Sequence, residues 1–173
     1  MYAGGEGKDV LKRVKRMQVA PGAKSFFFKL YTGILSVRTF QADRSFYLPW
    51  GTNCLICQKP ENMDHVFLHC WEGVYFWDVL QRIVQKELPL NSYGIRFLPI
   101  VDEEEMPFDL IMLCGLQCLW RAHMADFYRD QDAQPARMYF RECMVKFVEL
   151  QKTQEILPEW LSRVEPLAAL REF

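Results

Sequence analysis

The sequence lacks any apolar run long enough to cross a lipid bilayer. Its longest apolar stretch, residues 110–120, spans 11 residues and contains Gln117, whereas a membrane-spanning helix needs roughly 20 apolar residues. The N-terminal residues also lack the apolar core of a signal peptide. We therefore expect an intracellular protein without membrane contact, and its residence in nucleus or cytoplasm stays open.

Signals for β-strands are few, and the sequence contains no internal repeat and no low-complexity segment. Of its 173 residues, 50% are hydrophobic and 14% are aromatic. Such a chain can bury a substantial core, which excludes wholesale disorder. The length suits one domain and is short for two. The sequence therefore predicts an all-α fold.

Hydrophobic periodicity predicts the positions of the helices along the chain. Asp9 is a candidate cap for the first helix, Gly33 is expected to end the second, and Pro166 is expected to interrupt the last. Residues 88–107 are expected to form a loop whose acidic run, residues 103–105, faces solvent. The expected helices cover residues 9–17, 24–31, 37–44, 65–87, 108–129, 136–153 and 160–170, and the one at 108–129 is apolar enough to be a central core helix.

The net charge is only −1, but positive charge is concentrated near the N-terminus. Residues 1–44 hold nine basic and three acidic side chains, so the remaining 129 residues carry a net charge of −7. A basic N-terminal part on an acidic body suits a polyanionic partner, but helices that merely expose charged faces give the same pattern. Charge alone leaves both interpretations open.

Four residues form the pattern Cys-x2-Cys-x7-His-x4-Cys, namely Cys54, Cys57, His65 and Cys70. Nothing indicates secretion, so we interpret clustered cysteines as metal ligands rather than disulfide partners. Three thiolates and one imidazole suit tetrahedral zinc, and a closed set of four ligands is typical of a structural ion. The sequence predicts one structural zinc in a knuckle that precedes a long helix. We accordingly divide the chain into a basic N-terminal helix and linker, residues 1–23, and a zinc-binding helical domain, residues 24–173.

The imidazole ligand raises a geometric question. His65 and Cys70 are about 140° apart around an ideal helix, so they converge only if the helix begins after His65 or if its first turn is irregular. His69 is the rival ligand, but His69 and Cys70 are adjacent in sequence and would chelate one tetrahedral ion poorly. We favour His65. The alternative to a zinc site is that Cys54 and Cys57 are ordinary buried thiols.

The other cysteines and histidines do not complete a second metal site. Cys114 and Cys118 share a helix face, but His123 lies about 140° around that helix from Cys118. We interpret Cys114, Cys118 and Cys143 as small core residues. His69 and His123 are expected at the surface or beside the zinc ligands.

Three further stretches accompany the cysteine motif: residues 29–38 (KLYTGILSVR), residues 63–70 (MDHVFLHC) with an aromatic near Trp77, and residues 119–122 (LWRA). Together with residues 53–57 (NCLIC), they resemble the zinc-binding domain that follows the reverse transcriptase in non-LTR, LINE-type retrotransposons. The resemblance covers residues 26–120. It implies a C-terminal fragment of such a polyprotein, or a stand-alone derivative, whose zinc segment helps handle RNA or target DNA.

The sequence departs from this family in two respects. Ser36 stands where the first stretch usually has a helix-breaking proline, and the polymerase with its Tyr-x-Asp-Asp-type motif is missing. No lysine follows residues 102–105 at nuclease-like spacing, and no complete set of acid, base and nucleophile can be assembled. Zinc ligation would also occupy the best candidate thiol nucleophiles. We therefore expect a protein that is not an enzyme.

The leading hypothesis is a zinc-stabilised nucleic-acid-binding module that contacts the phosphate backbone of RNA or DNA. Helical spacing places the candidate contacts in a stripe opposite the apolar side of the first helix. These candidates are Lys12, Arg13, Lys15 and Arg16. The alternative is a zinc-stabilised structural or protein-interaction domain that docks on a reverse transcriptase domain and makes no nucleic-acid contact. No small-molecule substrate is expected in either case.

Overall fold

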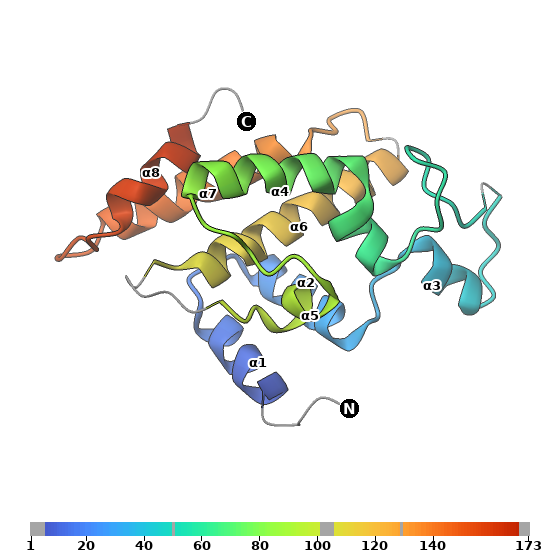
Figure 1. The fold of residues 1–173 in the computed structure, drawn as a ribbon, viewed down its shortest axis with the longest axis horizontal. Coiled ribbons are helices and arrows are strands. Elements are labelled where there is room, and N and C mark those ends of the chain that lie inside the picture. The colour runs from blue at the N-terminus through green and yellow to red at the C-terminus, as the bar shows by residue number, and fades with distance from the viewer. Residues whose placement is uncertain (1–5, 50, 101–105, 129, 170–173) are drawn as a thin grey trace.

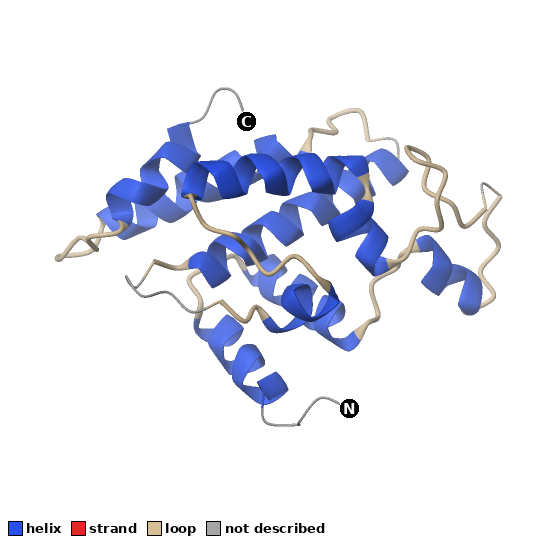
Figure 2. Cartoon of the chain, viewed as in Figure 1, coloured by secondary structure: helices blue, strands red, loops and turns tan. Residues whose placement is uncertain are grey.

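The computed structural model describes residues 6–49, 51–100, 106–128 and 130–169, and these residues form helices and loops without a β-strand (Figures 1 and 2). The predicted all-α fold is therefore confirmed. No helix in these ranges is long and apolar enough to span a membrane. The helices are α1 (Glu6–Arg16), α2 (Pro21–Thr32), α3 (Arg38–Asp43), the π-helix η1 (His65–His69), α4 (Trp71–Val84), α5 (Ser92–Phe97), α6 (Phe108–Phe127), α7 (Ala136–Lys152) and α8 (Leu161–Ala169).

Helix α6 runs through the middle of the molecule, as the sequence predicts (Figure 1). It packs against α7, α2 and η1, and α7 in turn packs against α8. Eleven of its 20 residues are buried, and they lie on all sides of the helix axis. Because α6 carries apolar side chains on all sides, the helices that pack against it share one continuous hydrophobic core.

Helix α1 begins earlier than its sequence pattern predicts. It starts at Glu6, so Asp9 lies inside the helix and is not its cap. Val10 and Val14 are buried in the same core as the side chains of α2 and α6. The expected division between residues 23 and 24 falls inside α2, which begins at Pro21 because a proline at the first helical position needs no hydrogen-bond acceptor. Helix α1 thus packs as part of the same body.

The predicted end of α2 is confirmed, whereas two other helix predictions need correction. Gly33 terminates α2 in the left-handed conformation with φ of 75°, as predicted. Residues 88–107 are not one loop, because α5 forms within them after Asn91, whose side chain accepts a hydrogen bond of 2.7 Å from Gly94 N. Helix α8 continues through Pro166 rather than being interrupted there. The predicted acidic loop face at residues 103–105 lies outside the described residues.

The side chain of Trp77 on α4 packs directly against Gly115 of α6. A Cβ at this position would lie 2.8 Å from Cη2 and 2.9 Å from Cζ3 of Trp77. The indole cannot move aside easily, because it is 2% exposed and its Nε1 donates a 2.7 Å hydrogen bond to the carbonyl of Phe67. The ring of Trp77 therefore occupies space that a side chain at position 115 would need.

We expect Gly115→Ala to lower the free energy of unfolding by about 1–3 kcal/mol through overpacking, although alanine is the better helix former by about 1 kcal/mol. Urea denaturation of wild type and variant measures this difference. Gly22→Ala is the matched control, because its Cβ would meet nothing closer than 3.7 Å. The control should be neutral or stabilising, and an equally stable Gly115→Ala would contradict this account of the packing.

Candidate metal centre

The first half of the metal motif lies on a tight loop between α3 and η1. Asn53 and Pro60 pair as an isolated antiparallel bridge at its base. Inside the bridge, Cys54 N donates to Lys59 O at 2.8 Å, and Gln58 N donates to Cys54 O at 2.9 Å. Gln58 completes the turn with a φ of 61°. These backbone bonds fold the Cys-x2-Cys segment into a knuckle that brings the two thiols to one side of the loop.

The knuckle also directs a backbone amide at its first sulfur. Ile56 N lies 3.4 Å from Cys54 Sγ and donates to it. A hydrogen bond of this kind stabilises the negative charge of a thiolate, which is the form of cysteine that binds a metal.

The second half of the motif is held by one π-helical turn. Residues His65–His69 form η1, and Cys70 N donates to His65 O at 2.7 Å across five residues. The irregular first turn that the sequence allowed is therefore confirmed, and it brings His65 and Cys70 together. The expected continuous helix over residues 65–87 is wrong, because Cys70 is extended (ψ 145°), α4 starts at Trp71 and the helix ends at Val84.

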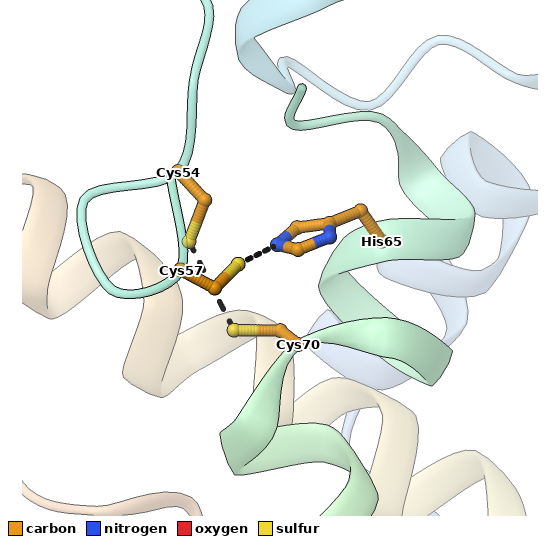
Figure 3. Close-up of side chains that lie close together, drawn as sticks. All are labelled: Cys54, Cys57, His65 and Cys70. Atoms are coloured by element: carbon orange, nitrogen blue, oxygen red, sulfur yellow. Dashed lines mark hydrogen bonds between the residues drawn. The ribbon is translucent and has the colours of Figure 1, made fainter. Parts of the chain in front are cut away.

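The two halves meet in a compact cluster of four ligand atoms (Figure 3). All four lie within 4.8 Å of one another. Cys54 Sγ is 3.9 Å from Cys70 Sγ, and Cys57 Sγ is 3.1 Å from His65 Nε2. Tetrahedral zinc with Zn–S bonds of about 2.3 Å requires sulfur atoms about 3.8 Å apart. The side chains therefore fit a single ion.

Burial separates the favoured histidine from its rival. Cys54, His65 and Cys70 are buried and Cys57 is partly exposed, whereas His69 is exposed and lies outside the cluster. Because four protein ligands surround one point, an ion bound here has no open position for a catalytic water. A closed ligand set of this kind is typical of a structural ion.

Burial also sets the protonation of the ligands. It is the largest cause that lowers the pKa of His65, which favours the neutral imidazole that a metal requires. Burial is likewise the largest cause that raises the pKa of Cys70, to about 12. A metal ion must therefore displace a proton from Cys70, and this makes metal binding dependent on pH.

A buried ion pair behind the knuckle ties the site to the rest of the fold. Arg38 Nε lies 3.2 Å from Glu61 Oε2, and the two side chains are 3% and 2% exposed. Arg38 Nη1 also donates to the carbonyl of Asn53 at 2.9 Å, immediately before the first ligand. Glu61 Oε1 lies 3.2 Å from Nε2 of His123 on α6. The pair thus joins α3, the knuckle and α6.

The charge of Glu61 is maintained by its partners. Burial alone would raise its pKa, but the hydrogen bond with His123 and the positive charges of His123 and Arg38 outweigh burial and leave the pKa lowered. Glu61 is therefore ionised at neutral pH. Sequence patterns did not single out Arg38 or Glu61 as parts of the site. His123 was expected either at the surface or beside the zinc ligands, and the structure places it beside the segment that carries the ligands.

The four basic residues predicted to bind nucleic acid differ in their surroundings. Lys12, Lys15 and Arg16 are exposed on α1. Arg13 instead points into the fold, where Nη1 bonds Asp109 at 3.0 Å and Leu98 O at 2.9 Å, and Nη2 bonds Phe97 O at 3.0 Å. Arg13 therefore ties α1 to α5 and α6, and its guanidinium is engaged by these three acceptors while its side chain stays 38% exposed.

No protein-family model, curated protein or solved structure matches this chain. The class of protein is therefore defined by the fold and the site themselves. It is an all-α protein with a buried cluster of three cysteines and one histidine that could hold one metal ion, and zinc is the ion that this ligand set suits best.

Proposed function

We propose that this chain is a zinc-stabilised, non-catalytic nucleic-acid-binding module, derived from the region that follows the reverse transcriptase in a non-LTR retrotransposon. The proposed derivation rests on the residues of the motifs quoted above. The proposed activity rests mainly on one surface, the basic face of α1. RNA or DNA would bind there through its phosphates, while zinc holds the knuckle in its folded form.

The basic face consists of Lys12, Lys15 and Arg16, and none of them forms an ion pair with another described residue. Lys24 of α2 adds a fourth cation nearby, because its Nζ donates to the carbonyl of Lys15 at 2.7 Å. Unpaired cations in a stripe can follow a phosphate backbone without reading base sequence. The competing explanation is that basic residues in the last turn simply stabilise the helix dipole.

We expect Lys12→Gln/Lys15→Gln to weaken binding to RNA and DNA and to make the salt dependence of binding shallower. Each lost phosphate contact should reduce the log–log salt slope by about 0.7–0.9 because fewer counterions are released. Fluorescence anisotropy with fluorescein-labelled single- and double-stranded oligonucleotides at several salt concentrations measures both effects.

The matched control is Arg82→Gln/Lys152→Gln. It removes the same number of positive charges from exposed ion pairs elsewhere on the surface. Its salt slope should equal that of wild type. If wild type fails to bind at low salt, or if the salt slope decreases equally in both double variants, α1 is not the contact surface.

The second candidate function is a protein-interaction domain, and exposed apolar side chains beside the zinc ligands favour it. On α4, directly after Cys70, Trp71 is 76% exposed and Tyr75 is 58% exposed. Such residues are enriched in protein interfaces. Absence of nucleic-acid binding by wild type, together with an in-frame reverse transcriptase immediately upstream in the genome, would favour docking on that polymerase.

A further inference from the structure

A second group of sulfur atoms lies in the core between α6 and α7, apart from the metal motif. Cys114 and Cys118 are one helical turn apart on α6 and are buried, and Cys143 on α7 is partly exposed. Cys143 Sγ lies 3.2 Å from Cys114 Sγ and is hydrogen-bonded to it. Cys143 is therefore the partly exposed member of this group, and its sulfur contacts that of the buried Cys114.

Two positive charges accompany Cys143. Lys146 is three residues farther along α7, and Arg121 of α6 stacks its guanidinium 4.2 Å above the ring of Tyr139, one turn before Cys143. Positive charge and hydrogen-bond donors near a sulfur both favour its thiolate.

The two sides of this contact differ in acidity. The hydrogen bonds that Cys143 shares with Cys114 and Cys118 are the largest causes that lower its pKa, with the charges of Arg121 and Lys146 adding to them. The hydrogen bond with Cys143 and complete burial raise the pKa of Cys114. One sulfur is thus disposed to be a nucleophile, and its neighbour retains a proton.

We propose that Cys143 and Cys114 form a peroxide-reactive dithiol that closes to a disulfide between α6 and α7. Cys143 is the sulfur that attacks peroxide, because it combines partial exposure with thiolate character. Cys114 is the resolving thiol, because its sulfur needs to approach by only about 1.2 Å to reach disulfide bonding distance. This site is separate from the proposed zinc and nucleic-acid functions.

The reaction consumes one hydrogen peroxide and two thiols. The Cys143 thiolate attacks one peroxide oxygen, forming an S–O bond, and the O–O bond breaks to release hydroxide. The result is a sulfenic acid on Cys143. Cys114 then gives its proton to the hydroxide, and its sulfur attacks the Cys143 sulfur. The S–S bond forms as the S–O bond breaks, and the departing oxygen takes up a proton from solvent. Across both steps, two electrons pass from the thiols to peroxide, and two water molecules form.

The test treats the zinc-loaded full chain with increasing hydrogen peroxide, blocks remaining thiols by alkylation and maps the digest by mass spectrometry without reduction. A chromogenic chelator reports zinc release in parallel. We expect a peptide pair linked through Cys143, two hydrogens lighter than the reduced pair, before zinc is released. Dithiothreitol should remove the link, and the linked protein should have a higher urea midpoint than the reduced protein.

Single variants assign the two roles. Cys118→Ala should keep the link, whereas Cys114→Ala should abolish it and leave Cys143 as a sulfenic acid that dimedone traps. Arg121→Gln/Lys146→Gln should slow link formation severalfold, with unchanged circular dichroism as the check on folding. The proposal is overturned if zinc leaves before any link forms, if Cys118 rather than Cys114 is the partner, or if the charge variant reacts as fast as wild type.

Discussion

Removal of zinc with a chelator is expected to release residues 51–60 while most of the helical circular dichroism remains. This knuckle is held by few backbone bonds and Cys54 is the one buried residue among residues 53–60, so the metal supplies most of its stability, whereas η1 keeps Val66 and Phe67 in the core. Helices α6 and α7 keep their own buried apolar contacts without the ion. Hydrogen exchange should therefore rise sharply in residues 51–60, less in η1 and only slightly in α6.

A pair of histidine variants makes this test specific to the ligands. His65→Gln removes a ligand and should weaken zinc binding by more than about 100-fold, which is the upper range for changing a residue that only supports a ligand. His69→Gln changes an exposed histidine outside the cluster and should bind like wild type. Binding should also weaken as pH falls, because protons compete for the ligands. Complete loss of helical signal on chelation, or equal effects of the two variants, would contradict the account.

Glu61→Ala is expected to lower the free energy of unfolding by about 3–5 kcal/mol, because it leaves the buried Arg38 guanidinium without its carboxylate. This loss is a large part of the roughly 5–15 kcal/mol that stabilises a typical domain. Chemical denaturation measures it. The double variant Arg38→Met/Glu61→Leu should recover much of the loss, because apolar residues can replace a buried ion pair as a unit.

The pH dependence of this pair has a definite sign. The pKa of Glu61 is lower in the folded protein than in the unfolded chain, so its stabilisation is present above the unfolded value and disappears as pH falls through the folded value. The stability difference between wild type and Glu61→Gln should therefore shrink on acidification. As a control, Asp78→Ala breaks the exposed ion pair with Arg82 and should cost less than about 0.5 kcal/mol. Similar losses of unfolding free energy for Glu61→Ala and Asp78→Ala would show that the buried ion pair does not stabilise the site.

The long helices and the metal motif could be predicted from the sequence for a physical reason. Helices α6 and α7 carry apolar residues at helical spacing over many turns, and this periodicity is a local property of the chain. The motif from Cys54 to Cys70 combines residue types and spacings that suit the ligation of one metal ion. The structure places these four residues in one cluster and excludes His69 from it.

The parts that sequence did not predict depend on short-range geometry or on distant partners. Helix α5 is only six residues long, and its signal is the single capping pair of Asn91 and Gly94. The break at Cys70 depends on one π-helical turn, which no periodicity reveals. The pairing of Arg38 with Glu61 joins residues 23 positions apart, and neither residue type is usually buried.

The same limit applies to the basic face of α1. Helical spacing placed Arg13 beside Lys12 and Arg16, but spacing could not show that Asp109 and two carbonyls of α5 would bind its guanidinium. A cation on a predicted surface stripe can stabilise the fold instead of binding a ligand. Only its neighbours in the tertiary structure decide which of these roles it has.

X-ray absorption at the zinc edge on purified protein identifies the atoms that bind the ion. We expect one zinc per chain with three sulfur ligands at about 2.3 Å and one nitrogen ligand at about 2.0–2.1 Å. Cys57→Ser should lose the ion or replace one sulfur by a lighter ligand. Absence of zinc in wild type, or a shell dominated by oxygen and nitrogen, would contradict the assignment of Cys54, Cys57, His65 and Cys70 as its ligands.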